Sequence, residues 1–278
     1  MGKENCHPYL LKIKLIYPKI KNPIGINMSF KPQFFQLNSS EIHLWAFSYN
    51  FLNKDIDLFA NILCQKERDR AAKYRFEKDK ISFICARGAL RILLEKYTNQ
   101  RSQNIVFKYD EFGKPLMEGP SVPHFNVSHS GDQILLGFCA NHPLGTDIEK
   151  ITTDFDILEI AKNHFYGDEI AALKSLPRLK RYEGFFSLWT RKEAVIKHIG
   201  KGLSLPLNSF SVSMESMNPV NIKEVKWTAK WATDHKLYAI KAPQNYKAAL
   251  SADKKVKAFR TFYNSETVYL LKDHIEKI

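Results

Sequence analysis

Three carboxylates and one lysine in this sequence have the types and spacing to act together in chemistry. Asp147 and Glu149 lie in a short β-rich stretch, LGTDIEK at 144–150, and alternate side chains of a strand point to the same side. Two carboxylates aimed at one point repel each other unless a cation lies between them or one is protonated. Hard divalent cations such as Mg²⁺ bind oxygen ligands of this kind together with substrate phosphates and water. The stretch therefore predicts a metal site, with a pair of solvated carboxylates on an edge strand as the plainer alternative.

A second stretch, KRYEGFFSLWTRKEAVIKHIGKGLSLP at 180–206, could complete such a site. Apolar residues recur in it at helical spacing, and Gly200 followed by Pro206 ends the helix. Glu193 and Lys197 are four residues apart and are therefore neighbours on one helix face. Glu193 could supply a third metal ligand, and Lys197 could bind a phosphate group. An ordinary surface ion pair is the alternative for these two residues.

The sequence FNVSHSG at 125–131 could supply donors for phosphate oxygens where a strand runs into a turn. Its hydroxyls at Ser128 and Ser130, the ring of His129 and the backbone N–H groups near the glycine are suited to that task. A Ser-His dipeptide also invites a hydrolase interpretation, but neighbours on a strand point to opposite faces and the GxSxG turn is missing. An ordinary structural turn remains the alternative.

Basic residues elsewhere could bind further phosphates. Lys114 lies in a GKP turn at 113–115, where glycine allows close backbone approach and proline fixes the turn. A basic helical set could either hold a phosphate or face solvent, and consists of Arg68, Arg70, Lys73, Arg75, Arg87 and Arg91. The chain has no Walker A sequence, no GxGxxG and no RNA-binding aromatic signature.

The composition is that of an ordinary globular protein. The chain has 278 residues, of which 44% are hydrophobic and 26% charged, enough for a full core. No stretch approaches the ~18 apolar residues that span a bilayer, and no signal peptide is evident, so we expect a cytoplasmic protein. The four cysteines form no CxxC pair, which argues against a zinc site and against a disulfide framework.

The net charge of +13 is explained either by an anionic partner or by a basic surface that only keeps the protein soluble. Nucleic acid, anionic lipid, a polyphosphate substrate and an acidic protein all satisfy it, and the basic residues are dispersed along the chain. A nucleic-acid-binding module is thus a rival interpretation. It predicts tight, salt-sensitive binding to any duplex.

The hydrophobic patterns occur twice in the same order. The first series predicts a strand at 42–47, helices at 55–64, 67–74 and 79–97, and strands at 105–109, 124–127 and 134–139. The second predicts a strand at 144–149, helices at 155–164, 168–176 and 180–199, and strands at 209–214, 220–226, 236–241 and 247–251. This order predicts an α+β fold made of a pseudo-twofold pair of similar halves, each with a small, mainly antiparallel sheet packed on helices.

The same patterns divide the chain into four parts. We expect an N-terminal extension at 1–40 and an N-terminal α+β half at 41–141. A C-terminal α+β half at 142–253 would carry the metal carboxylates. A final extension at 254–278 would pack on one half or remain loose.

Taken together, these stretches resemble the phosphopantetheinyl transferases of the broad-specificity, surfactin-synthetase type. The signature of that family is a (V/I)G(V/I)D-x-E segment followed later by W(S/A)xKEAxxKxxGxGL. The matching stretches here are LGTDIEK at 144–150, WTRKEAVIKHIGKGLSLPL at 189–207, FNVSHSG at 125–131 and GKP at 113–115. Thr146 replaces the usual valine or isoleucine, on the strand face opposite the carboxylates. The resemblance covers about 45–251.

The resemblance implies a holo-[acyl-carrier-protein] synthase activity. Such an enzyme transfers 4′-phosphopantetheine from coenzyme A to a serine hydroxyl of an acyl or peptidyl carrier protein and releases adenosine 3′,5′-bisphosphate. The implied metal is Mg²⁺, with Mn²⁺ as an alternative. The implied partner is an acidic carrier protein of fatty-acid, polyketide or nonribosomal peptide synthesis, with no nucleic acid and no membrane. The implied state is a monomer whose active site lies between the halves.

The resemblance also assigns residue roles. Asp147, Glu149 and Glu193 are expected to bind Mg²⁺, and Asp147, Glu193 and Lys197 to form the catalytic set. The expected contacts with coenzyme A are Arg70, Arg87, Lys114, Ser128, His129 and Lys197, with His129 at the 3′-phosphate and Arg87 added from the basic helical set. Glu193 is our hypothesis for the base that takes the serine proton. A member that binds carrier protein without catalysis is a further alternative, against which the three carboxylates argue.

Overall fold

The computed structural model describes residues 36–215, 218–227 and 229–277, so all but the last five positions of the extension expected at 1–40 lie outside the described residues. The first series of elements is β1 (Glu41–Ser48), η2 (Tyr49–Asp55), α2 (Ile56–Ile62), α3 (Gln65–Ala72), α4 (Glu77–Thr98), η3 (Ser102–Asn104), β2 (Lys108–Tyr109), β3 (Pro115–Leu116), β4 (His124–Ser130) and β5 (Gln133–Cys139). The second is β6 (Leu144–Lys150), α5 (Ile157–His164), α6 (Gly167–Ser175), α7 (Arg178–Ile199), η4 (Gly202–Ser204), η5 (Leu207–Ser209), β7 (Phe210–Val212), β8 (Ile222–Val225), α8 (Ala229–Asp234), β9 (His235–Ile240) and β10 (Tyr246–Asp253). The chain continues into β11 (Ala258–Phe262) and α9 (Asn264–Ile275).

The strand order confirms the α+β fold with two similar halves. One sheet has the order β11-β1-β5-β4 and another has the order β6-β10-β9. In each half the first strand of the series pairs antiparallel with the last, which pairs antiparallel with the strand before it. Two further pairs, β2–β3 and β7–β8, form small separate sheets. The described residues belong to one compact unit, so the boundaries at 141 and 253 stay predictions.

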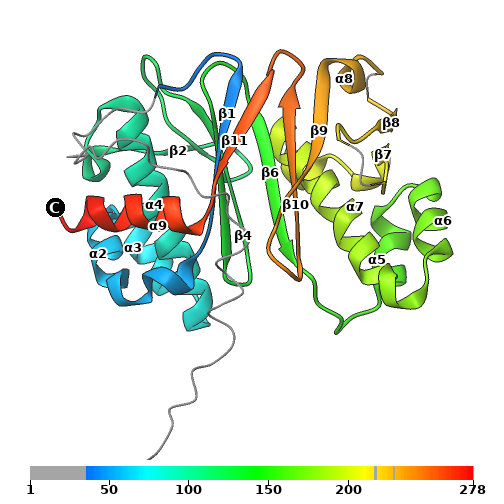
Figure 1. The fold of residues 1–278 in the computed structure, drawn as a ribbon, viewed down its shortest axis with the longest axis horizontal. Helices are drawn as coiled ribbons and strands as arrows, with labels where there is room; N and C mark the ends of the chain where they lie inside the picture. Colours follow the sequence, from blue (N-terminus) through cyan, green and yellow to red (C-terminus); the bar gives the residue numbers. More distant parts are fainter. Residues whose placement is uncertain (1–35, 216–217, 228, 278) are drawn as a thin grey trace, which may run out of the picture. The chain divides into compact units, whose positions relative to one another are not determined.

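Helices flank the two sheets on opposite sides (Figure 1). One apolar cluster joins the β11-β1-β5-β4 sheet to helices α2, α3, α4 and α9, with Trp45 and Phe138 among its buried members. A second joins the β6-β10-β9 sheet to helices α5, α6 and α7 around Phe185 and Leu188. A third contains Leu44, Leu135 and Ile148 from both sheets. The burial of these faces provides the main stabilisation of the arrangement.

The long helix of each half carries a buried ion pair at the equivalent position. Helices α4 and α7 both have 22 residues and both end at a residue in left-handed conformation, Asn99 and Gly200. Arg91 and Lys192 lie at the same position, fourteen residues after the respective helix begins. Each pairs with the third residue of the preceding helix: Arg91 with Glu67 at 2.7 Å, and Lys192 with Glu169 at 2.8 Å. This equivalence supports the pseudo-twofold relation independently of the strands.

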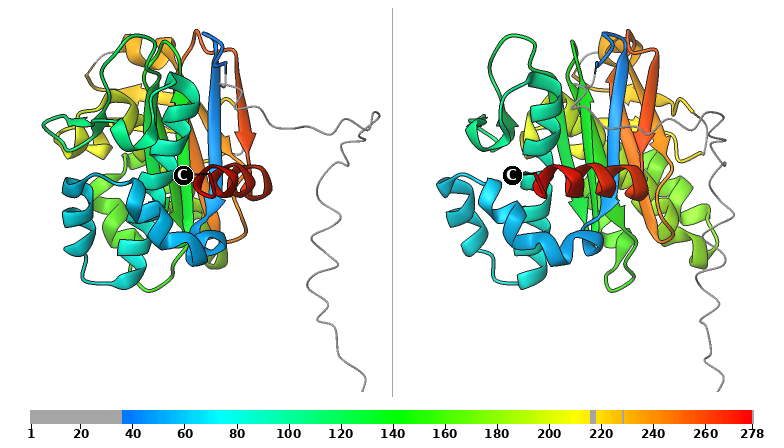
Figure 2. Two further views of the ribbon diagram at one scale, coloured as in Figure 1. Left: turned by 90° about the vertical axis from the view of Figure 1, so that its left-hand side faces the viewer. Right: turned by 60° about the vertical axis from the view of Figure 1, so that its left-hand side comes forward.

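The segment expected as a final extension belongs to the first half. Strand β11 pairs parallel with β1, and helix α9 packs beside β1, as the views in Figure 2 show. Asn264, the first residue of α9, accepts a hydrogen bond from the Ser48 N–H at 2.8 Å, while Leu271 and Ile275 are buried in the first apolar cluster. The extension therefore contributes to the core of that half.

Local competition shortens one expected strand. The pattern at 105–109 predicts a strand, yet only Lys108–Tyr109 pairs. The Arg91 guanidinium donates to the carbonyls of Ser102 and Ile105 at 2.8 and 2.9 Å, so these groups turn toward the helix. Helix α8 and strand β3 were not predicted, because both are very short. No helix in the described ranges has both the length and the apolar character to cross a membrane.

Replacing Gly145 by alanine should destabilise the protein by about 3 kcal/mol or more, the upper range for overpacking. A Cβ at this position would overlap the Ala194 carbonyl oxygen and the His198 nitrogen, which are helix backbone atoms that cannot rotate away. Urea unfolding would measure the change. Gly167→Ala is the matched control, since nothing lies within 4 Å of its Cβ position. Similar midpoints for the two variants would contradict the prediction.

Candidate functional site between strands β4 and β6

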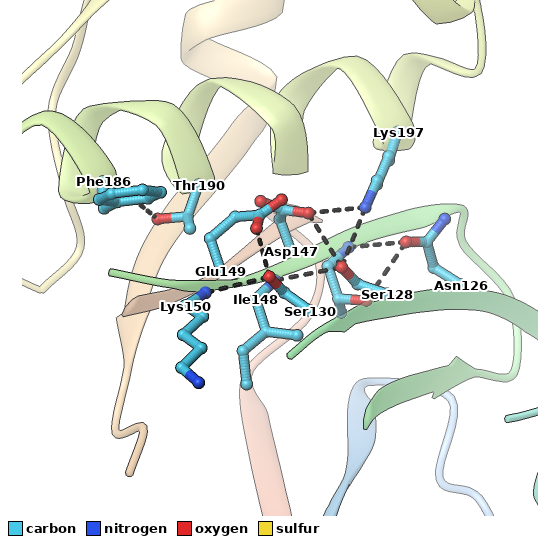
Figure 3. Close-up of polar contacts among 11 residues, drawn as sticks. Asn126, Ser128, Ser130, Asp147, Ile148, Glu149, Lys150, Phe186, Thr190 and Lys197 are labelled. Carbon is cyan, nitrogen blue, oxygen red and sulfur yellow. Dashed lines mark hydrogen bonds and ion pairs between the residues drawn. The ribbon is translucent and has the colours of Figure 1, made fainter. Parts of the chain in front are cut away.

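Strands β4 and β6 lie side by side and are joined by side chains. Alternate residues of β4 point toward β6 and accept hydrogen bonds from its backbone N–H groups (Figure 3). The acceptor and donor pairs are Asn126 with Thr146 at 3.0 Å, Ser128 with Ile148 at 3.2 Å, and Ser130 with Lys150 at 3.1 Å. The three pairs hold strands β4 and β6 parallel in one register, and they bring the FNVSHSG and LGTDIEK stretches of the two halves together.

Asp147 is the buried centre of the site. Its side chain points toward helix α7, where Lys197 Nζ lies 2.6 Å from Asp147 Oδ1. Ser128 Oγ donates to the same oxygen at 2.9 Å and accepts from Lys197 Nζ at 3.1 Å. Asp147 is only 1% exposed, and its Oδ2 is buried without a hydrogen-bond partner. The structure thus brings Asp147, Ser128 and Lys197 into direct contact, and leaves one carboxylate oxygen available.

Glu149 and Glu193 extend the negative charge around Asp147. Ser130 Oγ donates to Glu149 Oε2 at 2.6 Å. Burial, followed by the charge of Asp147, raises the pKa of Glu149 to about 7, despite the lowering effects of Ser130 and Lys197. Burial and Asp147 also raise the pKa of Glu193, whose carboxylate makes no hydrogen bond to another described residue. Both glutamates are therefore poised to exchange a proton for another cation.

The donor set fits a hard divalent cation. The unpartnered Asp147 oxygen and the raised pKa values of Glu149 and Glu193 are relieved by added positive charge. In this structure the positive charge next to Asp147 comes from the ion pair with Lys197. Within the described part of the chain, no three His, Cys, Asp or Glu side chains are already gathered closely enough to hold a metal. The assignment of Asp147, Glu149 and Glu193 as ligands stays a prediction.

Metal-free protein should lose stability as the pH rises through the Glu149 titration. The folded-state pKa is about 7 and the usual value is 4.5, so the folded chain binds the proton more tightly than the unfolded chain between these values. The stability that the folded chain gains by binding this proton more tightly is fully present below about pH 4.5 and is lost above about pH 7. Thermal unfolding in EDTA from pH 4 to 8 would measure it. Glu149→Gln should show a flatter profile, and identical profiles for the two proteins would refute the assignment.

Two hollows lie along β4 and α7, on either side of the Asp147–Lys197 pair. One encloses about 310 Å³ between the 113–115 turn, Phe125 and the end of α7, and Glu193 and Lys197 line it. The other encloses about 780 Å³ and is lined by Glu149, Ser130 and Trp189. Lys114 Nζ donates to the Lys197 carbonyl oxygen at 3.0 Å. This hydrogen bond joins the 113–115 turn to helix α7 beside the smaller hollow. A long ligand could therefore occupy both hollows across the charged centre.

The remaining predicted residues gather on the other face of β4. His129 points away from Ser128, and its pKa is lowered by desolvation and by the charges of Lys197, Arg87 and Arg70. The Arg87 guanidinium stacks over Phe107 at 5.4 Å, and its Nη1 is buried without a hydrogen-bond partner. Arg70 is exposed, and the guanidinium groups of Arg70 and Arg87 lie over the same Phe83 ring at 5.3 and 5.7 Å. The three cationic or neutral donors form a region suited to a phosphate, separate from the carboxylates.

Two features of the site exceed the sequence prediction. The sequence predicts Ser130 only as a possible phosphate donor, yet its hydroxyl donates to Glu149. Its spacing of two residues from Ser128, which places both on one face of a strand, could have indicated this role. Lys192, inside the KEA triplet next to Glu193, is buried against Glu169 and the Phe210 carbonyl. Lys192 lies four residues after Leu188 and four before Ile196, and this position on the apolar face of the helix could have indicated its burial. The Ser128 hydroxyl, predicted to contact coenzyme A, is engaged by Asp147 and Ile148 in this structure.

Comparisons with known proteins cover both halves. A family model described as 4′-phosphopantetheinyl transferase superfamily matches residues 143–251, and one described as 4′-phosphopantetheinyl transferase, N-terminal, matches residues 48–140. The chain is similar to the 4′-phosphopantetheinyl transferase gsp of Aneurinibacillus migulanus, with 34% identity over 64% of this chain and 70% of that protein. It is also similar to Sfp of Bacillus subtilis, with 33% identity over 59% of this chain and 72% of that protein.

Two further likenesses are more distant. The 4′-phosphopantetheinyl transferase HetI of Nostoc is 29% identical over 69% of this chain and 82% of that protein. A crystal structure of the holo-ACP-synthase from Plasmodium yoelii matches 40% of this chain and 92% of that chain, with 16% identity and a TM-score of 0.31.

Proposed function

This chain belongs to the 4′-phosphopantetheinyl transferase family, and we propose that it transfers the 4′-phosphopantetheine group of coenzyme A to a serine of an apo carrier protein. The observation that carries the proposal is the centre where Asp147 meets Ser128 and Lys197, with Glu149 and Glu193 beside it. A centre of this kind, with a hollow on each side, suits a long ligand that carries phosphates in its middle. Coenzyme A has that form.

The proposed reaction exchanges one phosphorus–oxygen bond for another. The carrier serine oxygen attacks the phosphorus that carries the pantetheine group, and the bond to the adenosine phosphate breaks. The serine proton passes to a base, and adenosine 3′,5′-bisphosphate departs with the bonding electrons. Negative charge grows on the departing phosphate, so the protein must stabilise that charge and align the attacking oxygen.

The residues of the site divide this work. Lys197 places its ammonium beside Asp147, where it can also meet a phosphate oxygen. Ser128 and Ser130 fix the orientation of the two strand carboxylates. When bound by Asp147, Glu149 and Glu193, Mg²⁺ would neutralise phosphate charge as a Lewis acid. The Arg70, Arg87 and His129 group would bind the 3′-phosphate, and the 113–115 turn would line the nucleotide side.

Glu193 is the base in this proposal. Its carboxylate lines the smaller hollow, has no hydrogen-bond partner among the described side chains, and has a raised pKa. Glu193→Gln should lower kcat roughly 100-fold, the usual size of a general-base contribution. Calorimetric titration with coenzyme A in the absence of Mg²⁺ should give an unchanged Kd, because this measurement does not depend on the metal ligands. Full turnover by the variant would exclude the role.

The basic surface suits an acidic carrier protein. A net charge of +13 would speed the encounter with such a partner and make it sensitive to salt. We propose that the enzyme acts as a monomer, since the two halves of one chain already supply both sides of the site. The charge alone equally motivates a nucleic-acid module, which nothing at the site favours.

Intact-mass spectrometry of an apo carrier protein would test the function. The carrier is incubated with this protein, coenzyme A and Mg²⁺, and we expect a mass gain equal to one phosphopantetheine group. The gain should disappear with EDTA and return with excess Mg²⁺. Several carriers, from fatty-acid, polyketide and nonribosomal peptide synthesis, are included. Absence of the gain with all of them, together with absence of coenzyme A binding, would refute the proposal.

A further inference from the structure

The turn between β4 and β5 is tied to the second half by one tyrosine. Tyr246, the first residue of β10, donates its hydroxyl hydrogen to Asp132 Oδ1 at 2.6 Å. The same hydroxyl oxygen accepts the Asp132 N–H at 3.2 Å. Gly131 has φ 56°, and a Cβ there would overlap the Tyr246 hydroxyl. The glycine thus admits the hydroxyl into the turn, where one group satisfies both a carboxylate and a backbone N–H.

The first half holds the other oxygen of Asp132. Three side chains donate to Oδ2: Ser48 at 2.5 Å, Gln133 at 3.0 Å and Asn50 at 3.2 Å. Burial would raise the pKa of Asp132, but the hydrogen bonds from Ser48 and Tyr246 lower it overall. The carboxylate therefore remains charged at neutral pH and accepts hydrogen bonds from both halves of the chain. Hydrogen bonds to a charged group are stronger than those between neutral groups.

This turn directly follows the residues that reach the site. The charges of Arg87 and Arg70 lower the pKa of His129, and Ser130 Oγ donates to Glu149 Oε2 at 2.6 Å. Gly131 and Asp132 line the larger hollow together with Glu149. A displacement of the turn would therefore move the donors of the 129–131 segment relative to the bound ligand.

We propose that Tyr246 and Asp132 are positioning residues for coenzyme A. They hold the 129–131 segment in place so that His129 meets the 3′-phosphate together with Arg70 and Arg87. Neither residue touches the reacting atoms. The inference rests on the proposed function and adds to it the part of the chain that sets affinity for the donor substrate.

The variant Tyr246→Phe keeps the ring over Gly131 and removes only the hydroxyl. KM for coenzyme A should rise about tenfold while kcat changes less than about threefold, the pattern of a lost binding contribution. With 3′-dephospho-coenzyme A, KM of the variant should stay within about twofold of that of the unaltered protein, because the affected contact is missing. Asp132→Asn should reproduce both results.

The matched control is Tyr238→Phe, in the neighbouring strand β9. Tyr238 packs against Phe259, and its hydroxyl makes no hydrogen bond to another described residue. KM should be unchanged in this variant. Thermal unfolding of all variants separates the roles: a lower midpoint for Tyr246→Phe with unchanged KM would show a purely structural residue and overturn the proposal. An equal rise in KM for both donors would overturn it as well.

Calorimetric titration keeps this test independent of catalysis. If the unaltered protein modifies no carrier but binds coenzyme A, the proposed function fails, and the same tenfold change is sought in Kd for coenzyme A. Equal Kd values for the unaltered protein and Tyr246→Phe would then refute the positioning role. If coenzyme A does not bind to the unaltered protein, both proposals fail.

Discussion

Asp147→Ala should reduce phosphopantetheine transfer by roughly a thousandfold, the scale of a lost electrostatic group at a reacting centre. The variant removes the buried carboxylate that orients Lys197 and Ser128, and one predicted metal ligand. The mass-spectrometric transfer assay, run at saturating coenzyme A, would measure the loss. We expect the thermal midpoint to change little, because the substitution also removes an unpartnered buried oxygen.

Asp154→Ala is the control for that variant. Asp154 is exposed and lies seven residues farther along the same half of the chain. It should keep full transfer activity. Asp147→Asn adds a second reading, because it keeps the shape of the side chain and loses the charge. Transfer within about tenfold of normal in both Asp147 variants would remove the carboxylate from the mechanism.

Lys192→Ala should lower the free energy of unfolding by about 4 kcal/mol, since it leaves an uncompensated charge in the interior. Lys192 is 0% exposed, pairs with Glu169 at 2.8 Å and donates to the Phe210 carbonyl oxygen at 2.5 Å. Glu169 also accepts the N–H groups of Tyr166 and Val212, each at 2.8 Å. The pair therefore joins α6, α7 and β7. Urea unfolding followed by circular dichroism would measure the change.

Two comparisons make the Lys192 prediction specific. Lys180→Ala, on the same helix, removes an exposed pair with Glu183 and should cost less than about 1 kcal/mol. Lys192→Met alone should also destabilise the protein, because it leaves the Glu169 charge uncompensated. Adding Glu169→Gln removes that charge as well, so the double variant should recover most of the stability that Lys192→Met loses. Equal changes in the free energy of unfolding for Lys180→Ala and Lys192→Ala would show that the buried pair stabilises the protein no more than the exposed one.

The sequence carried enough information for the halves and for most of the centre. Apolar periodicity predicted the long helices, and alternation on β6 placed Asp147 and Glu149 on one side, where α7 lies. Glu193 and Lys197 follow from helical spacing. These features depend on a few residues near each other in the chain, which is why they can be read locally.

The features that escaped prediction depend on residues far apart in the chain. The pairing of Lys192 with Glu169 and of Tyr246 with Asp132 requires knowledge of which elements touch. The segment after 253 has weak patterns of its own, and only its pairing with β1 makes β11 a strand. Only Lys108–Tyr109 of the expected 105–109 strand pairs, because the buried Arg91 donates hydrogen bonds to the carbonyl groups of Ser102 and Ile105.

Strand β11 has a consequence for the number of substrates that one chain can hold. It lies parallel on the outer edge of β1, as β4 lies parallel on the edge of β6. The β1–β5 pair of the first half can be superposed on the β6–β10 pair of the second. Trp45 and Phe47 of β1 then occupy the positions of Asp147 and Glu149 of β6. Trp45 stacks on Phe262 of β11 at 4.0 Å, so this edge is filled by packed rings. Within the described residues, the β1–β11 edge therefore lacks the carboxylates of the β4–β6 edge, and the proposed function predicts that one chain binds one coenzyme A.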